Sequence, residues 1–122
     1  MTQEEKELLL QDLCARLPYG VKLRYVEDLV VKKESHIITL NNIYLEHILN
    51  GDADIKPYLR PLSSMTEEER EKFQTYIFES NEVGDILTLD SADWLNKKHF
   101  DYRGLIPMGL ALEAPAGMYK VE

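Results

Sequence analysis

The chain has 122 residues, of which 44% are hydrophobic and 30% charged, and a formal net charge of −8. This length predicts a single domain over residues 1–122 that buries about two-thirds of its unfolded surface without needing disulfides. The polar, acidic start argues against a signal peptide, and no apolar run reaches the roughly 18 residues of a membrane span. With one cysteine, the composition favours a reduced, cytoplasmic location and no membrane partner.

Acidic residues are concentrated in the second half of the chain. Residues 66–122 hold 12 acidic and 6 basic residues, whereas residues 1–65 hold 10 and 8. Nine of the acids lie between Glu67 and Asp93. Because such a surface repels phosphate backbones, we expect no nucleic-acid partner. A solvated helix face is the simpler interpretation, and an acidic decoy for a basic or DNA-binding protein is the alternative.

A first helix is expected over about residues 3–16. Thr2 followed by Glu5 gives a capping-box pattern, and a Pro and a Gly at 18 and 20 end the helix. Apolar residues at helical spacing predict its buried face, which comprises Leu10, Leu13, Cys14 and Leu17 with Leu9 beside them. Cys14 is therefore expected in the core, with its thiol inaccessible in the native protein.

A β-rich region follows this helix. Residues 21–25 alternate between apolar and basic or polar side chains, as in a half-buried strand. The β-branched runs 29–31 and 37–40, with a polar stretch at 32–35 between them, predict a hairpin. Residues 43–49 fit either a short helix or a strand, and their β-rich surroundings favour the strand.

Two prolines flank the next segment, so residues 58–60 are expected at an edge or in a connection. A second helix over about 67–80 is predicted by overlapping capping boxes. These boxes pair Ser64 with Glu67, and Thr66 with Glu69. The side chains that this helix region should bury are Met65, Phe73, Tyr76 and Ile77.

A third helix is expected to begin at a cap formed by Asp90 or Ser91 and to run to about His99. Trp94 and Leu95 should face the core from this helix. Glycines and prolines divide the remaining residues into short extended pieces.

The usual patterns of catalytic and ligand-binding sites are missing. The three histidines, His36, His47 and His99, are far apart in the sequence and form no metal-binding motif. Ser63 and Ser64 lack the surroundings of a nucleophile, and no glycine-rich phosphate loop occurs. The sequence therefore predicts no catalytic, cofactor-binding or metal-binding residues.

A set of aromatic and arginine side chains has the composition of interface anchors, namely Tyr58, Arg60, Trp94, Tyr102 and Arg103. In the alternative interpretation, the two arginines pair internally with acids and the rings fill the rim of the core. Arg103 is of special interest because a guanidinium between a helix end and Gly104 can bind carboxylates or carbonyls through two hydrogen bonds.

Three long stretches carry a resemblance. They are residues 8–20 (LLLQDLCARLPYG), 55–69 (IKPYLRPLSSMTEEE) and 93–119 (DWLNKKHFDYRGLIPMGLALEAPAGMY), about half of the chain. Together they resemble a family of small uncharacterised proteins of gut-dwelling anaerobic bacteria that are often carried in prophage-like or other mobile regions. The family has no known activity or cofactor, so the resemblance implies only an accessory role in a mobile-element setting.

The expected fold is α+β, with an N-terminal helix, a small antiparallel sheet that could curl as in SH3 domains, two further helices and a C-terminal extended segment. The expected function is non-enzymatic binding of a protein partner. A small enzyme with a polar site near His99, Asp101 and Arg103 is an alternative, as is the acidic decoy. A buried polar pocket holding His99 with two acids would favour the enzyme, whereas an exposed apolar and Tyr/Arg patch would favour the binder.

Overall fold

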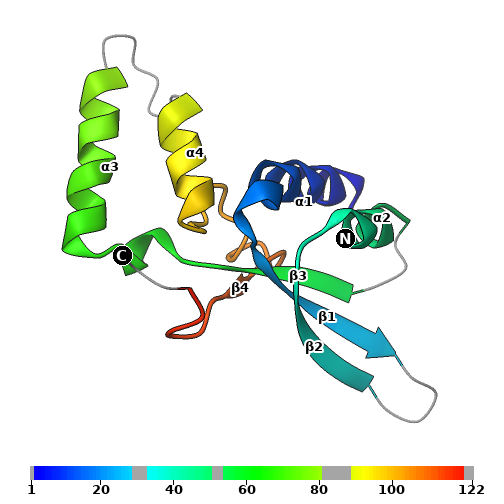
Figure 1. Cartoon of the computed structure of the whole chain (residues 1–122). Coiled ribbons are helices and arrows are strands. Elements are labelled where there is room, and N and C mark those ends of the chain that lie inside the picture. The colour runs from blue at the N-terminus through cyan, green and yellow to red at the C-terminus, as the bar shows by residue number, and fades with distance from the viewer. Residues whose placement is uncertain (1, 29–32, 51–53, 81–88, 120–122) are drawn as a thin grey trace.

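The computed structural model describes residues 2–28, 33–50, 54–80 and 89–119. The protein has an α+β fold, as predicted (Figure 1). Its helices are α1 (Gln3–Arg16), α2 (Asn42–Asn50), α3 (Glu67–Ser80) and α4 (Leu89–Lys97), and its strands are β1 (Lys22–Asp28), β2 (Lys33–Thr39), β3 (Asp54–Leu59) and β4 (Leu112–Glu113).

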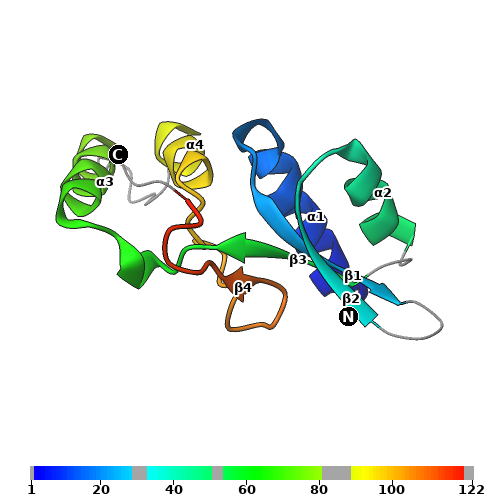
Figure 2. The same cartoon turned by 60° about the horizontal axis from the view of Figure 1, so that its bottom comes forward.

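The strands form one sheet in the order β2-β1-β3-β4. β1 is antiparallel to both β2 and β3, whereas β3 and β4 are parallel, so the sheet is mixed rather than wholly antiparallel. β2 and β4 lie at the two edges, and the described strands form an open sheet without an SH3-like closure. Figures 1 and 2 show α1 and α2 together on one side of the sheet, with α3 and α4 beyond the end of β3.

The first helix has the predicted bounds but a different inner face. Its capping box is formed, with the Glu5 N–H donating to the Thr2 hydroxyl at 3.1 Å and the Thr2 N–H to the Glu5 carboxylate at 2.9 Å. The prediction that Cys14 is buried is wrong, because its side chain is exposed. The face that α1 buries runs one position earlier, through Leu9, Asp12, Leu13 and Arg16. Because Asp12 and Arg16 are charged, the spacing of apolar residues alone does not predict this face.

The predicted hairpin exists but pairs different residues. β2 pairs with β1 along its whole length, from Thr39 opposite Lys22 to Lys33 opposite Asp28. Residues 33–35, expected in the turn, therefore belong to a strand, and the run 29–31 lies outside the described residues. The strand predicted at 21–25 corresponds to β1.

Residues 43–49 are helical, so the prediction of a strand there is wrong. The side-chain oxygen of Asn41 accepts the N–H groups of Ile43 at 2.9 Å and Tyr44 at 3.3 Å, which caps the start of α2. Ile48 is only 3% exposed and joins the core. The cap and this inward residue outweigh the β-rich sequence around them.

The prediction that residues 58–60 form an edge or a connection is wrong for Tyr58 and Leu59, which belong to the inner strand β3, whereas Arg60 follows this strand. Pro57 also lies inside β3. It stands opposite Leu23 of β1. Leu40 N–H donates to Val21 O at 3.0 Å. Because every second residue of an antiparallel strand bonds toward the same neighbour, Leu23 also bonds toward β2. The pair of Leu23 and Pro57 is therefore one that forms no backbone hydrogen bonds between β1 and β3. The N–H that proline lacks is therefore not needed by β1.

The start of α3 confirms one of the two predicted capping boxes. Thr66 N–H donates to the Glu69 carboxylate at 3.0 Å, and Glu69 N–H donates to the Thr66 hydroxyl at 3.2 Å. The Ser64 hydroxyl instead donates to Pro61 O at 2.7 Å, so the predicted Ser64 cap is wrong. α4 begins at Leu89, which places Asp90 and Ser91 inside the helix rather than before it.

Among the side chains that the structure describes, the buried apolar ones form two clusters. The larger one lies between the sheet, α1, α2 and the segment 105–111. The smaller one contains Trp94, Leu95 and Phe100, with Met65 and Phe73 packed against it. Trp94 and Leu95 are thus buried as predicted, whereas the predicted burial of Tyr76 and Ile77 concerns side chains outside the described set.

Candidate functional site

Arg60, a predicted interface anchor, is held inside the protein. Its side chain donates to both carboxylate oxygens of Glu69, at 2.6 and 2.8 Å, and its guanidinium lies 4.2 Å from the centre of the Phe100 ring. Only 8% of the residue is exposed. Burial acts to raise the pKa of the Glu69 carboxyl, but the hydrogen bonds from Arg60 and Thr66 outweigh it, so this pKa lies below its usual value. The pair therefore joins the end of β3 to the first turn of α3.

Arg103 is also paired internally, with an acid on α1. Its Nε donates to Asp12 Oδ1 at 3.0 Å, and its Nη2 donates to the Tyr102 hydroxyl at 3.2 Å. The same Asp12 carboxylate accepts two hydrogen bonds from Arg16, at 2.7 and 3.1 Å. Arg16 in turn donates to Phe100 O at 2.6 Å. This cluster ties α1 to the segment that follows α4.

Tyr102 and Trp94 complete these internal contacts. The Tyr102 ring lies 5.4 Å from the guanidinium carbon of Arg16 and 5.0 Å from that of Arg103, while its hydroxyl donates to the Asn96 side chain at 3.0 Å. Trp94 is 7% exposed. The contacts of these side chains match the alternative in which they serve the fold. Their part in binding a partner stays a prediction.

Tyr58, the remaining candidate, lies where the pairing of β1 with β3 ends and the Tyr119 hydroxyl connects the two strands. The β1–β3 pairing ends at Leu23 opposite Pro57, and the next pair along would be Lys22 with Tyr58. There the Tyr119 hydroxyl accepts from Lys22 N–H at 2.8 Å and donates to Tyr58 O at 2.7 Å. Burial raises the pKa of Tyr119 to about 12. No local sequence signal predicts this link, because it spans 97 and 61 residues.

The side chains of the alternative polar site go to separate partners. The Asp101 carboxylate accepts the N–H groups of Leu105 at 2.8 Å and Ile106 at 2.9 Å, which fixes a turn. Arg103 is bonded to Asp12 and Tyr102, as above, and the ring of His99 stacks on Tyr119. The Asp101 carboxylate and the Arg103 guanidinium are therefore bonded within the fold, while His99 is held through its ring and its Nδ1 is buried without a hydrogen-bond partner among the described residues.

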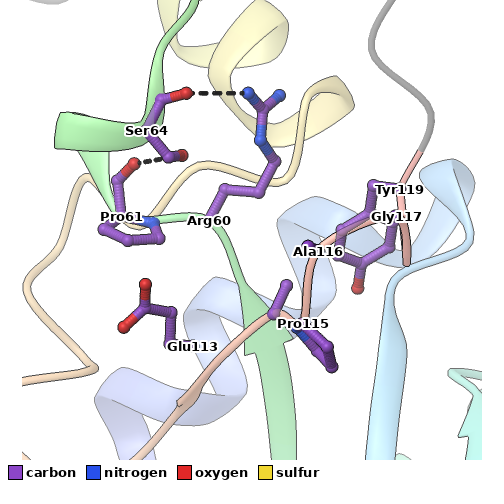
Figure 3. A pocket seen from close by; sticks show the side chains of 9 residues that line it. Arg60, Pro61, Ser64, Glu113, Pro115, Ala116, Gly117 and Tyr119 are labelled. Atoms are coloured by element: carbon purple, nitrogen blue, oxygen red, sulfur yellow. Dashed lines mark hydrogen bonds between the residues drawn. The ribbon is translucent and has the colours of Figure 1, made fainter.

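A shallow pocket of about 200 Å³ lies between the start of the α3 region and the C-terminal segment. Figure 3 shows the Arg60 guanidinium directed toward Ser64, on the side away from Glu113. Both terminal nitrogens of Arg60 already donate to Glu69, and the Tyr119 hydroxyl is bonded to the sheet backbone. The side chains of Arg60 and Tyr119 that line the pocket are thus already engaged by the fold, and Glu113 adds a carboxylate to its lining.

The outer face of the sheet is the surface that α1 and α2 leave open. Successive side chains of a strand point to opposite faces, and Val21 and Leu23 are buried on the face that meets the helices. The described side chains of the opposite face, called the outer face below, are Lys22, Arg24, Val26, Ser35, Ile37, Thr39, Lys56 and Tyr58. Lys22 Nζ donates to the Thr39 hydroxyl at 2.7 Å, which places both on this face.

The outer face combines apolar and basic side chains in an acidic protein. Ile37 of β2 is 60% exposed and stands opposite Arg24 of β1, which in turn stands opposite Lys56 of β3. Lys22, Arg24 and Lys56 supply the basic side chains of the described part of this face.

Comparisons of the chain with protein families, with curated proteins and with solved structures found no match. Among the described residues, no three His, Cys, Asp or Glu side chains are grouped so that they could hold a metal ion. A helix with the length and apolar character needed to cross a membrane is also missing from the part of the chain that the structure describes. The exposed Ile37 on the uncovered face of the sheet makes the outer face the candidate site that the geometry supports best.

Proposed function

We propose that this protein is a non-enzymatic module that binds another protein through the outer face of its sheet. One observation carries the proposal: α1 and α2 cover one face of the sheet, and the other keeps Ile37 60% exposed on an edge strand. A solvated sheet face normally carries polar side chains. The outer face instead mixes polar residues with the larger side chains of Val26, Ile37 and Tyr58. Such a mixture of apolar and polar groups is found at interaction surfaces.

The contacts around the alternative polar site support a non-enzymatic role. Asp101 is held by two backbone N–H groups, and Arg103 is held by Asp12. A general acid or base must be within reach of a substrate, whereas the Asp101 carboxylate is engaged by the backbone and the Arg103 guanidinium by Asp12. The resemblance described above adds a setting, in which an accessory factor of a mobile element acts by binding a protein.

The proposal is tested by placing a photocrosslinking amino acid on the outer face. Benzoylphenylalanine at position 37 should give a specific crosslinked protein in cells of the organism that encodes the chain. The matched control carries the same group at Gln74, an exposed position of α3. We expect an adduct from position 37 that position 74 does not give. Identical adduct patterns, or no adduct at position 37, would contradict binding through this face.

A further inference from the structure

We propose that the partner contributes an extended, acidic segment that pairs with the free edge of β2 as an additional strand. This inference, which rests on the proposed binding function, names the chemistry and conformation of the partner. It follows from the hydrogen-bonding direction of β2, the unequal lengths of the two sheet edges, and the position of Lys22.

The backbone of β2 presents free donors and acceptors at its edge. Because Leu40 N–H donates to Val21 O at 3.0 Å, the residues of β2 alternate from there between bonding toward β1 and away from it. Ser35, Ile37 and Thr39 fall on the outward positions. β2 is the terminal strand, so no described residue pairs with these groups.

The two edges of the sheet differ in how well they are protected. β4 has two residues, whereas β2 has seven and exposes Ile37 in its second half. Proteins commonly keep edge strands short or block them, because a long free edge is a template for another strand. A peptide added to such an edge gains main-chain hydrogen bonds, and alternate side chains supply specificity.

Charge at the edge favours an acidic occupant. The ammonium group of Lys22 reaches across to the Thr39 hydroxyl on β2, at 2.7 Å, and so lies beside the strand to be added. A carboxylate opposite Thr39 would come within its reach, and an apolar side chain opposite Ile37 would cover that residue. At physiological ionic strength charges are screened over about 8 Å, so a carboxylate opposite Thr39 interacts more strongly with Lys22 than with those acids of the −8 chain that lie farther away.

The test uses the ¹⁵N-labelled full chain and a blocked heptapeptide with glutamate at positions 1 and 7, valine at positions 3 and 5, and threonine between them. In either strand direction, this spacing can put valine opposite Ile37 and glutamate opposite Thr39 on the same face. Saturating peptide should slow amide exchange at Ser35, Ile37 and Thr39 at least about tenfold, because a new ladder bond must open before exchange occurs. The amides of His36 and Ile38, which bond toward β1, should change little. A peptide with lysine in place of glutamate should bind more weakly. Absence of protection, or equal binding of both peptides, would overturn the proposal.

Two substitutions sharpen this experiment. Ile37→Pro removes an N–H that β1 does not use, so it should abolish peptide binding, while Ile37→Val should retain it. Circular dichroism checks that each variant is folded. If Ile37→Pro does not fold, Lys22→Glu tests the proposal instead. This variant should bind the glutamate peptide about threefold to tenfold more weakly and should prefer the lysine peptide. Unchanged preference would contradict an acidic occupant.

The outcomes separate this inference from the proposed function. Crosslinking at position 37 without edge protection by the peptide would mean that the partner binds the outer face in another way. Protection of the same three amides that grows with protein concentration, without peptide, would identify a second copy of the chain as the occupant and overturn the acidic segment. Failure of both experiments would remove the binding function itself.

Discussion

The ring of His99 lies on the ring of Tyr119, with the centroids 3.8 Å apart and the planes 16° from parallel. His99 has a φ of 66° and directly follows the last turn of α4. The hydrogen bonds from Phe100 N–H to Leu95 O and from His99 N–H to Asn96 O form a Schellman motif, with His99 at the position usually taken by glycine. We infer that the stack on Tyr119 offsets the strain of this left-handed conformation.

This environment predicts a pH-dependent stability. Burial first, and then nearby cations led by Arg16, lower the pKa of His99 to about 4. Because the folded state disfavours the charged imidazole, neutral His99 makes its full contribution to the free energy of unfolding above the ordinary pKa of about 6.5. This contribution to stability should decline as the pH falls from 6.5 toward 4.

Thermal unfolding between pH 7.5 and 4.5 measures this effect. His99→Asn serves as the comparison, since asparagine tolerates the left-handed backbone and does not titrate. The free energy of unfolding of the unaltered chain should fall more steeply with decreasing pH than that of the variant. Parallel curves would show that His99 does not titrate as its surroundings require.

Tyr119→Phe should destabilise the protein by about 1–3 kcal/mol, because Lys22 N–H and Tyr58 O would lose the hydroxyl that bridges them. Chemical denaturation gives the difference. Tyr44→Phe is a matched control, whose ring packs beside Tyr25 at 5.9 Å, and we expect a change within about 0.5 kcal/mol. Equal effects of the two substitutions would show that the bridge contributes nothing specific.

Cys14 should react with a thiol reagent in the native protein, because its side chain is exposed on α1. The labelled fraction, followed by mass spectrometry, should reach one thiol per chain without denaturant. Labelling only after unfolding would restore the inner face that the apolar spacing predicts. The sulfur atom thus reports which side of α1 faces the core.

Predictions from sequence succeed where the controlling contacts are local. The capping boxes of Thr2 with Glu5 and Thr66 with Glu69 join residues three positions apart, and α1 and α3 begin where these boxes predict. The helix at 43–49 is also stabilised locally, because the Asn41 side chain caps its start. This cap acts over two and three residues, whereas the β-rich surroundings that favour a strand do not fix the conformation of this segment.

The candidate site depends on contacts that sequence spacing does not reveal. Asp12 and Arg16 form a fully buried pair. Their further partners come from distant parts of the sequence, since Arg103 lies 91 residues from Asp12 and Phe100 O lies 84 residues from Arg16. A charged pair is expected on the surface unless such partners are known. For the same reason, the outer face becomes visible only when the register of β1 with β2 and β3 is known.

Arg103→Lys is the substitution that best separates a role in the fold from a role in recognition. Lysine retains the charge but lacks the planar guanidinium that bonds Asp12 and Tyr102 together. We expect a loss of about 1–3 kcal/mol in the free energy of unfolding, while crosslinking through position 37 persists. Asp12→Asn is the companion variant; it leaves the fully buried Arg16 without its counter-ion and should cost about 3–5 kcal/mol. Normal stability of Arg103→Lys combined with loss of the crosslinked partner would instead assign Arg103 to the binding surface.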